Sequence, residues 1–162
     1  MYIIIAIISF SFGYFCSYCM EKKKNVKREK NNSGIRKNEE VLNQWLVFKQ
    51  AGIGLDKILK DQKIKTVAIY GMGIMGRHVL RELINSDIVI KYGLDNKRMT
   101  PINGIPVKSL REELEIPDLI INSVLKMPDK ENIEKEIQEV VGCKVISLDT
   151  LLFNYSYLYK EN

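Results

Sequence analysis

Three glycines with the spacing Gly71-x-Gly73-x-x-Gly76 follow an apolar segment at residues 65–70, and Asp95 ends the next apolar segment. In a dinucleotide-binding fold, the first glycine allows a sharp turn and the second lets a phosphate approach the backbone. The third lets the following helix pack closely against the sheet. The start of that helix offers unpaired N–H groups and a partial positive charge to an anion. The spacing therefore predicts a nucleotide-binding site.

Asp95 admits two interpretations. Its position at the end of a strand is typical of a carboxylate that accepts hydrogen bonds from both ribose hydroxyls, which favours NAD over NADP because a 2′-phosphate would be repelled. Lys97 and Arg98 follow directly, however, and could tolerate an additional phosphate. The structural alternative is that Asp95 caps a turn that it forms with Asn96. The sequence leaves both interpretations open.

Other candidate ligand contacts flank the glycines and end a later strand. Arg77 lies in the first turn of the predicted helix, where it could reach a phosphate or be solvated. Asn122 and Ser123 end the fourth predicted strand, beside the crevice in which open α/β sheets bind ligands, although capping of a loop explains them equally well. The predicted cofactor-binding residues are Gly71, Met72, Gly73, Ile74, Met75, Gly76, Arg77, Asp95, Asn96, Asn122 and Ser123.

No catalytic residues are predicted. His78 is the single histidine and has no obvious partners for a Ser/His/Asp triad. The predicted domain lacks a Tyr-x-x-x-Lys pair of the short-chain dehydrogenase type, and no cluster of His, Cys, Asp and Glu has metal-ligand spacing. Hydride transfer needs an acid or base near the carbonyl and a closed site. The sequence therefore favours a binding module over an enzyme, without deciding whether a reaction is catalysed.

The pattern around these residues predicts the elements that position them. Strands alternate with helices over residues 64–162, which predicts a Rossmann-like α/β domain of three layers with about five mostly parallel strands. Residues 39–63 form a helical lead-in, and residues 151–159 form either a last helix or a contact surface. The predicted strands are 65–70, 87–93, a short one near 107, 119–122 and 144–148, and the predicted helices between them are 76–85, 110–115 and 128–141.

The first twenty residues differ from the rest because residues 2–20 carry no charge and are mostly apolar. Such a helix is about 28 Å long, which is enough to cross a hydrocarbon core. A cleaved signal peptide is the alternative, but it would need basic residues before the apolar segment, and here they follow it. We therefore predict a single N-terminal transmembrane helix over residues 1–20.

Residues 21–38 form a basic segment that we expect to be a mobile linker. Residues 21–37 contain eight lysines and arginines and two glutamates, a charge of +6, while the whole chain is +5, so the rest sums to −1. The positive-inside rule then predicts a single-pass protein of the cell membrane with its C-terminal domain in the cytoplasm. Because the predicted domain is nearly neutral, we expect no nucleic-acid partner despite a pI near 9.0.

Four segments within residues 64–150 resemble the nucleotide-binding domain at the front of bacterial polysaccharide-biosynthesis proteins. Those proteins include homologues of nucleoside-diphosphate-sugar epimerases and dehydratases, initiating sugar-phosphate transferases and sugar acyltransferases. The resemblance implies that Gly71, Gly73, Gly76 and Asp95 hold NAD or a nucleotide-sugar. The catalytic half that such proteins usually carry has no counterpart in this sequence. The segments are residues 69–76, Tyr-Gly-Leu-Asp-Asn at 92–96, Ile-Asn-Gly-Ile-Pro-Val at 102–107, and Pro-Asp-Leu-Ile-Ile at 117–121.

Three functional hypotheses follow. The leading one is a membrane-anchored cytoplasmic module that binds a nucleotide or nucleotide-sugar and is accessory to surface-polysaccharide biosynthesis, with a protein partner or a second copy as a possible associate. The second is an NAD-dependent nucleotide-sugar epimerase or reductase that a partner or a homodimer completes. The third is a regulatory NAD-sensing module of a transport system.

Overall fold

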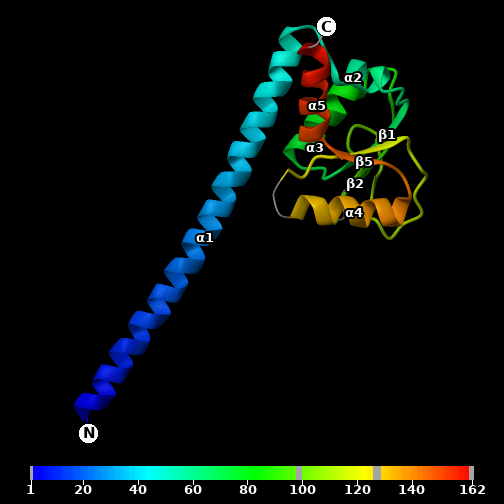
Figure 1. Ribbon diagram of the computed structural model, residues 1–162. Coiled ribbons are helices and arrows are strands. Elements are labelled where there is room, and N and C mark those ends of the chain that lie inside the picture. Colours follow the sequence, from blue (N-terminus) through cyan, green and yellow to red (C-terminus); the bar gives the residue numbers. More distant parts are fainter. Residues whose placement is uncertain (1, 98–99, 126–128, 161–162) are drawn as a thin grey trace. The chain divides into compact units, whose positions relative to one another are not determined.

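The computed structural model describes the backbone of residues 2–97, 100–125 and 129–160 (Figure 1). Side chains are described from residue 18 onward within these ranges, except at 19, 27, 30, 31, 33, 129 and 157–160. The chain divides into two compact units, Met1–Arg36 and Lys37–Asn162. The second unit holds the sheet and all of the predicted nucleotide contacts.

The first helix, α1 (Tyr2–Gln50), extends through residues 21–38, where we expected a mobile linker. Lysine, arginine and glutamate dominate that segment and are good helix formers, and an isolated glycine such as Gly34 costs only about 1 kcal/mol in a helix. The expected anchor at 2–20 lies mostly at positions whose side chains are outside the described set. Among the residues that were described, no helix combines the length and apolar character needed to cross a membrane.

The centre of the second unit is a five-stranded sheet in which all neighbouring strands are parallel. Its order is β3-β2-β1-β4-β5, so the chain starts in the middle, builds one side and then crosses to the other. This topology is Rossmann-like and confirms the predicted α/β class. It also places a switch point between β1 and β4, where open sheets bind ligands. The strands are β1 (Thr66–Tyr70), β2 (Val89–Leu94), β3 (Val107–Lys108), β4 (Leu119–Asn122) and β5 (Val145–Ser147).

Helices cover both faces of the sheet, with α3 and α5 on one side and α4 on the other (Figure 1). Besides α1, the helices are α2 (Leu55–Asp61), α3 (Ile74–Leu83), α4 (Asp129–Val141) and α5 (Leu148–Lys160). The larger core lies on the α3 side, where the rings of Phe48 from α1 and Tyr155 from α5 meet edge to face at 5.7 Å. Residues 151–159, for which a contact surface was the alternative, therefore belong to the last helix, and Leu151 and Leu152 pack in this core.

The opposite face is covered by α4 and by an irregular segment over residues 109–117. There Ile137 and Val141 from α4 pack on Tyr70 and Tyr92 from the sheet. The predicted helix at 110–115 is wrong, because the chain makes only one turn after Ser109 and then has no regular secondary structure up to β4. A helix nucleus is costly, and the stretch before Pro117 is too short to recover that cost.

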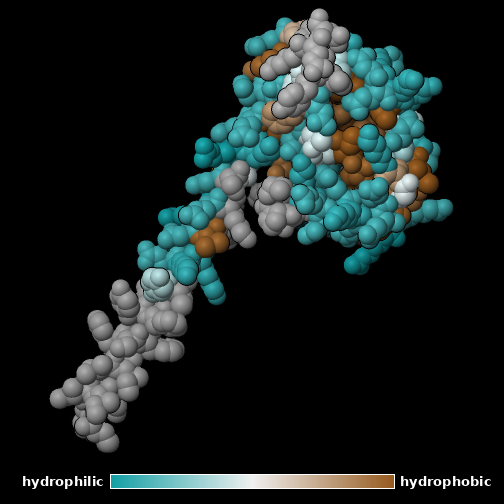
Figure 2. All heavy atoms as spheres, in the orientation of Figure 1, coloured by the Kyte–Doolittle hydropathy of each residue, from teal (hydrophilic) through white to brown (hydrophobic). Residues whose placement is uncertain are grey.

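The surface of the second unit is largely hydrophilic on the face that Figure 2 shows, with hydrophobic residues in small groups. Three of its exposed large apolar side chains, Leu42, Leu46 and Val47, lie on the part of α1 that belongs to this unit, and the others lie singly on separate elements. These others include Ile74 on α3, Val89 on β2, Ile116 before β4 and Val140 on α4. Single exposed apolar residues of this kind are normal for a globular surface.

Candidate nucleotide-binding site

The three glycines form the connection between β1 and α3, as the spacing predicts. Gly71 has a φ of +84°, a conformation that suits glycine, and a Cβ added there would lie 2.6 Å from the Cγ2 atom of Val124. A Cβ added at Gly76, inside the first turn of α3, would collide with the carbonyl oxygen of Gly71. The first and third glycines are therefore required by the packing of the protein itself.

Gly73 is different because the fold does not require it to be glycine. Its φ is −72°, and a Cβ added there would find no described atom within 4 Å. It is the N-cap of α3, and no side chain among the described residues caps this end of the helix. The space beside Gly73 thus lies at a helix start whose first N–H groups lack a side-chain partner, and that is the geometry that accommodates a phosphate.

The other residues of the loop divide between the core and the surface. Met72 and Met75 are buried, and Met72 fills the space that the missing side chain of Gly93 leaves on β2. Ile74 is 76% exposed beside Gly73. The Nε atom of Arg77 donates a hydrogen bond to the carbonyl oxygen of Met72 at 3.2 Å, which holds this cation close to the loop.

Asp95 joins the end of β2 to the glycine loop. Its Oδ2 atom accepts a hydrogen bond from the backbone N–H of Met72 at 2.9 Å, and its Oδ1 atom accepts one from the N–H of Lys97 at 2.9 Å. The structure thus contains the turn cap that the sequence allowed as an alternative, together with a bond to the loop that the sequence did not indicate. Each carboxylate oxygen has a second lone pair, so binding of ribose stays a prediction.

Asn122 is the last residue of β4 and Ser123 follows it, and both side chains make hydrogen bonds to the backbone of nearby loops. The Ser123 hydroxyl lies 2.9 Å from the carbonyl oxygen of Tyr70 and 2.5 Å from that of Gly71, so it holds the turn after β1. The amide of Asn122 donates to Glu134 on α4 at 3.2 Å and accepts the N–H of Val124 at 2.9 Å. Both side chains are buried and shape the loops around the switch point, and direct ligand contact by either stays a prediction.

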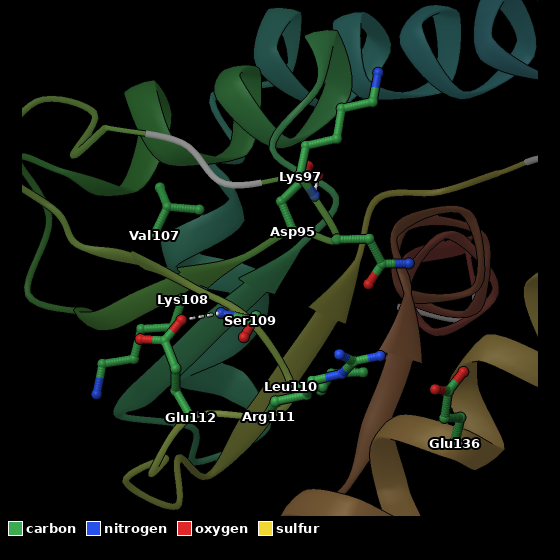
Figure 3. Close-up of a pocket in the computed structure, with 10 residues that line it drawn as sticks. Asp95, Lys97, Val107, Lys108, Ser109, Leu110, Arg111, Glu112 and Glu136 are labelled. Carbon is green, nitrogen blue, oxygen red and sulfur yellow. Dashed lines mark hydrogen bonds between the residues drawn. The ribbon is translucent and has the colours of Figure 1, made fainter.

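A cavity of about 910 Å³ opens beside Asp95 at the carboxyl ends of β2 and β3 (Figure 3). The backbone N–H of Asp95 donates to the carbonyl oxygen of Lys108 at 3.1 Å, and this pairing brings the segment after β3 next to the end of β2. Asn96 and Lys97 line the cavity with Asp95, whereas Arg98 lies outside the described residues. The remaining lining residues were not among the predicted contacts; they are Val107, Lys108, Ser109, Leu110, Arg111, Glu112 and Glu136.

Two tyrosines near this edge keep their protons at neutral pH. Burial, followed by repulsion from the Glu136 carboxylate, raises the pKa of Tyr70 above its ordinary value. Burial, followed by Cys143 and Glu115, raises the pKa of Tyr92 to about 12, and its hydroxyl donates to the carbonyl oxygen of Glu115 at 2.8 Å. Neither phenol is tuned toward neutral pH, as a general acid or base would need to be.

His78 does not line the cavity beside Asp95. It lies in a shallow hollow of about 220 Å³ that Trp45 and Glu82 also line.

Glu82 is the residue that sequence analysis missed in this region. Its Oε2 atom accepts a hydrogen bond from the Trp45 indole at 2.8 Å, and its Oε1 atom accepts one from the N–H of Leu55 at 2.7 Å. It therefore ties α1 and the start of α2 to α3. Within the described side chains, no group of three His, Cys, Asp or Glu residues is placed to hold a metal ion.

Comparisons of the chain with models of known protein families, with curated proteins and with solved structures find no significant match.

Proposed function

We propose that this protein binds a nucleotide diphosphate, either a dinucleotide such as NAD or a nucleotide-sugar, and that it acts by binding rather than by catalysis. The hydrogen bond between Asp95 and Met72 is the observation that supports this most strongly. It ties Asp95, which lines the cavity at the ends of β2 and β3, directly to the glycine loop. A diphosphate beside Gly73 would then place its ribose at Asp95 and its base in the cavity.

The space beside Gly73 supports the position of the diphosphate. Glycine is needed at positions 71 and 76 by the fold, but at 73 neither the φ angle nor a neighbouring atom demands it. A glycine that the protein does not need for its own packing fits a place where another molecule approaches the backbone. The apolar side chains of Val107 and Leu110 on the cavity wall suit a base.

The experiment is a calorimetric titration of the full chain with NAD, NADH, UDP and a set of UDP- and dTDP-sugars, using Gly73→Asp as the test variant. The aspartate fits the open space and the φ of −72°, so it should fold and repel a phosphate. Asn85→Asp adds the same charge on an exposed turn after α3 and is the matched control. Binding that Gly73→Asp abolishes and Asn85→Asp retains is expected. If none of these nucleotides gives a heat of binding, the proposal is overturned.

The resemblance to polysaccharide-biosynthesis proteins supports a role for this module in surface-polysaccharide assembly at the cell membrane. We further propose that residues 2–20 anchor the protein and that the basic residues at 21–37 keep the second unit in the cytoplasm. The uncharged composition of the first segment and the charge of +6 on the second support this. The full chain should sediment with membranes and resist alkaline extraction, and a chain lacking residues 2–20 should not. Equal extraction of both would contradict an anchor.

A further inference from the structure

Two hydrogen-bond donors of the cavity, the side chains of Arg111 and Ser109, have no partner among the described residues. Figure 3 shows the Arg111 side chain extending into the cavity from the segment after β3. Within the described residues, its guanidinium has no hydrogen bond or ion pair, not even with Glu136, which faces it from α4. The hydroxyl of Ser109 is likewise without a partner among those residues. An arginine side chain has five N–H donors and no acceptor.

The other charged groups of the cavity have partners or are solvated. Both oxygens of Asp95 accept backbone N–H groups. Oε1 of Glu112 accepts the N–H of Ser109 at 2.8 Å. The Nζ atom of Lys108 donates to the carbonyl oxygen of Glu113 at 3.0 Å and lies 5.6 Å from the centre of the Tyr92 ring. Glu136 on α4 and Lys97 after β2 are exposed to solvent, as is Arg111.

We propose that Arg111, with Ser109, binds a phosphomonoester carried on the ribose of the bound nucleotide. This rests on the proposed function, because the glycine loop must hold the diphosphate for the ribose to lie at Asp95. A planar guanidinium matches two phosphate oxygens with two parallel N–H groups, and the serine adds a third donor. The ligand class is thus a ribose-phosphorylated dinucleotide or coenzyme.

This inference revises the preference for NAD that Asp95 alone suggested. An acid at this position disfavours a ribose phosphate because its negative charge repels the phosphate. Here both oxygens already accept N–H groups from the protein, and a free cation lies in the same cavity. The negative charge of Asp95 is therefore offset by Arg111 where the additional phosphate would lie.

The test compares two ligand pairs that differ only in the phosphate, NADP with NAD and coenzyme A with dephospho-coenzyme A. Each is titrated into the full chain and into Arg111→Gln, Arg111→Lys and Arg81→Gln. Arg81 is an exposed arginine on α3 outside the cavity lining and serves as the matched control. In at least one pair, the phosphorylated member should bind about tenfold to a hundredfold more tightly. Arg111→Gln should remove that ratio, Arg111→Lys should restore part of it, and Arg81→Gln should leave it unchanged.

The outcomes separate the two proposals. Equal binding of both members of each pair, or a ratio that survives in Arg111→Gln, overturns the phosphomonoester subsite and leaves the nucleotide-binding proposal standing. Binding confined to uridine or thymidine nucleotide-sugars has the same consequence. If no nucleotide of any class binds, both proposals fail. The fluorescence of Trp45, which lies outside the cavity lining, establishes that each variant is folded.

Discussion

The carboxylate of Asp95 accepts the backbone N–H of Met72 at 2.9 Å, across 23 residues of sequence. Met72 is fully buried and lies between the first two glycines of the loop. The bond therefore fixes the loop from the end of the neighbouring strand before any ligand arrives. A site held in place in this way loses little conformational freedom on binding, which favours affinity.

Asp95→Ala should therefore weaken both folding and binding. It leaves the Met72 N–H without its partner, and we expect a loss of about 1–3 kcal/mol in the free energy of unfolding. Urea denaturation measures this, with Glu139→Ala on the exposed face of α4 as the control. A loss no larger than that of the control would show that the bond contributes nothing to stability.

The three glycines should respond unequally to alanine. Gly76→Ala places a methyl group against the carbonyl oxygen of Gly71, and overpacking of this kind costs about 1–3 kcal/mol. Gly73→Ala meets no atom and has an ordinary φ, so its effect should stay within about 1 kcal/mol of zero. Thermal unfolding of the two variants gives the comparison. Equal destabilisation would mean that position 73 is also packed by the protein.

The sequence indicated the parts of the site that depend on local geometry. The turn at Gly71 and the contact of Gly76 with it lie within six residues, so the spacing of the glycines was enough to predict them. The cavity depends on the pairing of β2 with β3, which brings Ser109 and Arg111 beside Asp95. Arg111 lies in the segment for which a helix over 110–115 was predicted. No local pattern encodes that pairing, so its residues could not be predicted.

Glu82→Ala should be one of the most destabilising substitutions outside the core. It removes the acceptor for the Trp45 indole and for the first N–H of α2, and it leaves Lys49 without the carboxylate that lies 3.1 Å from its Nζ atom. Two hydrogen bonds to a charged acceptor suggest a loss of about 2–4 kcal/mol. Trp45 is the single tryptophan, so its fluorescence reports unfolding directly.

The control for this prediction is Glu82→Gln, which keeps one acceptor and the shape of the side chain. Glu82→Gln should lower the free energy of unfolding less than Glu82→Ala does. The Trp45 emission should also differ between the two variants. If alanine and glutamine variants unfold at the same urea concentration as the unmodified chain, the carboxylate does not hold the three helices together.

The free energy of unfolding should fall in acid because several aspartates have lowered pKa values. The N–H groups of Lys65 and Thr66 lower the pKa of Asp118 by bonding to its Oδ2 atom at 2.9 and 2.8 Å. For Asp149, burial raises the pKa, but hydrogen bonds led by that from Lys130 outweigh it, so the net direction is downward.

The direction of the pH effect follows from these shifts. A carboxyl group whose pKa is lower in the folded than in the unfolded chain stabilises the fold fully above its unfolded value, near 3.9. That contribution is lost as the pH falls through the folded value, so stability should decline below about pH 4. Asp118→Asn should be less stable at pH 7 and decline less steeply in acid, whereas Glu131→Gln, an exposed control on α4, should follow the unmodified chain. Urea denaturation between pH 2 and 7 measures this, and parallel curves for Asp118→Asn and the unmodified chain would show that the two backbone N–H groups do not favour the charged carboxylate.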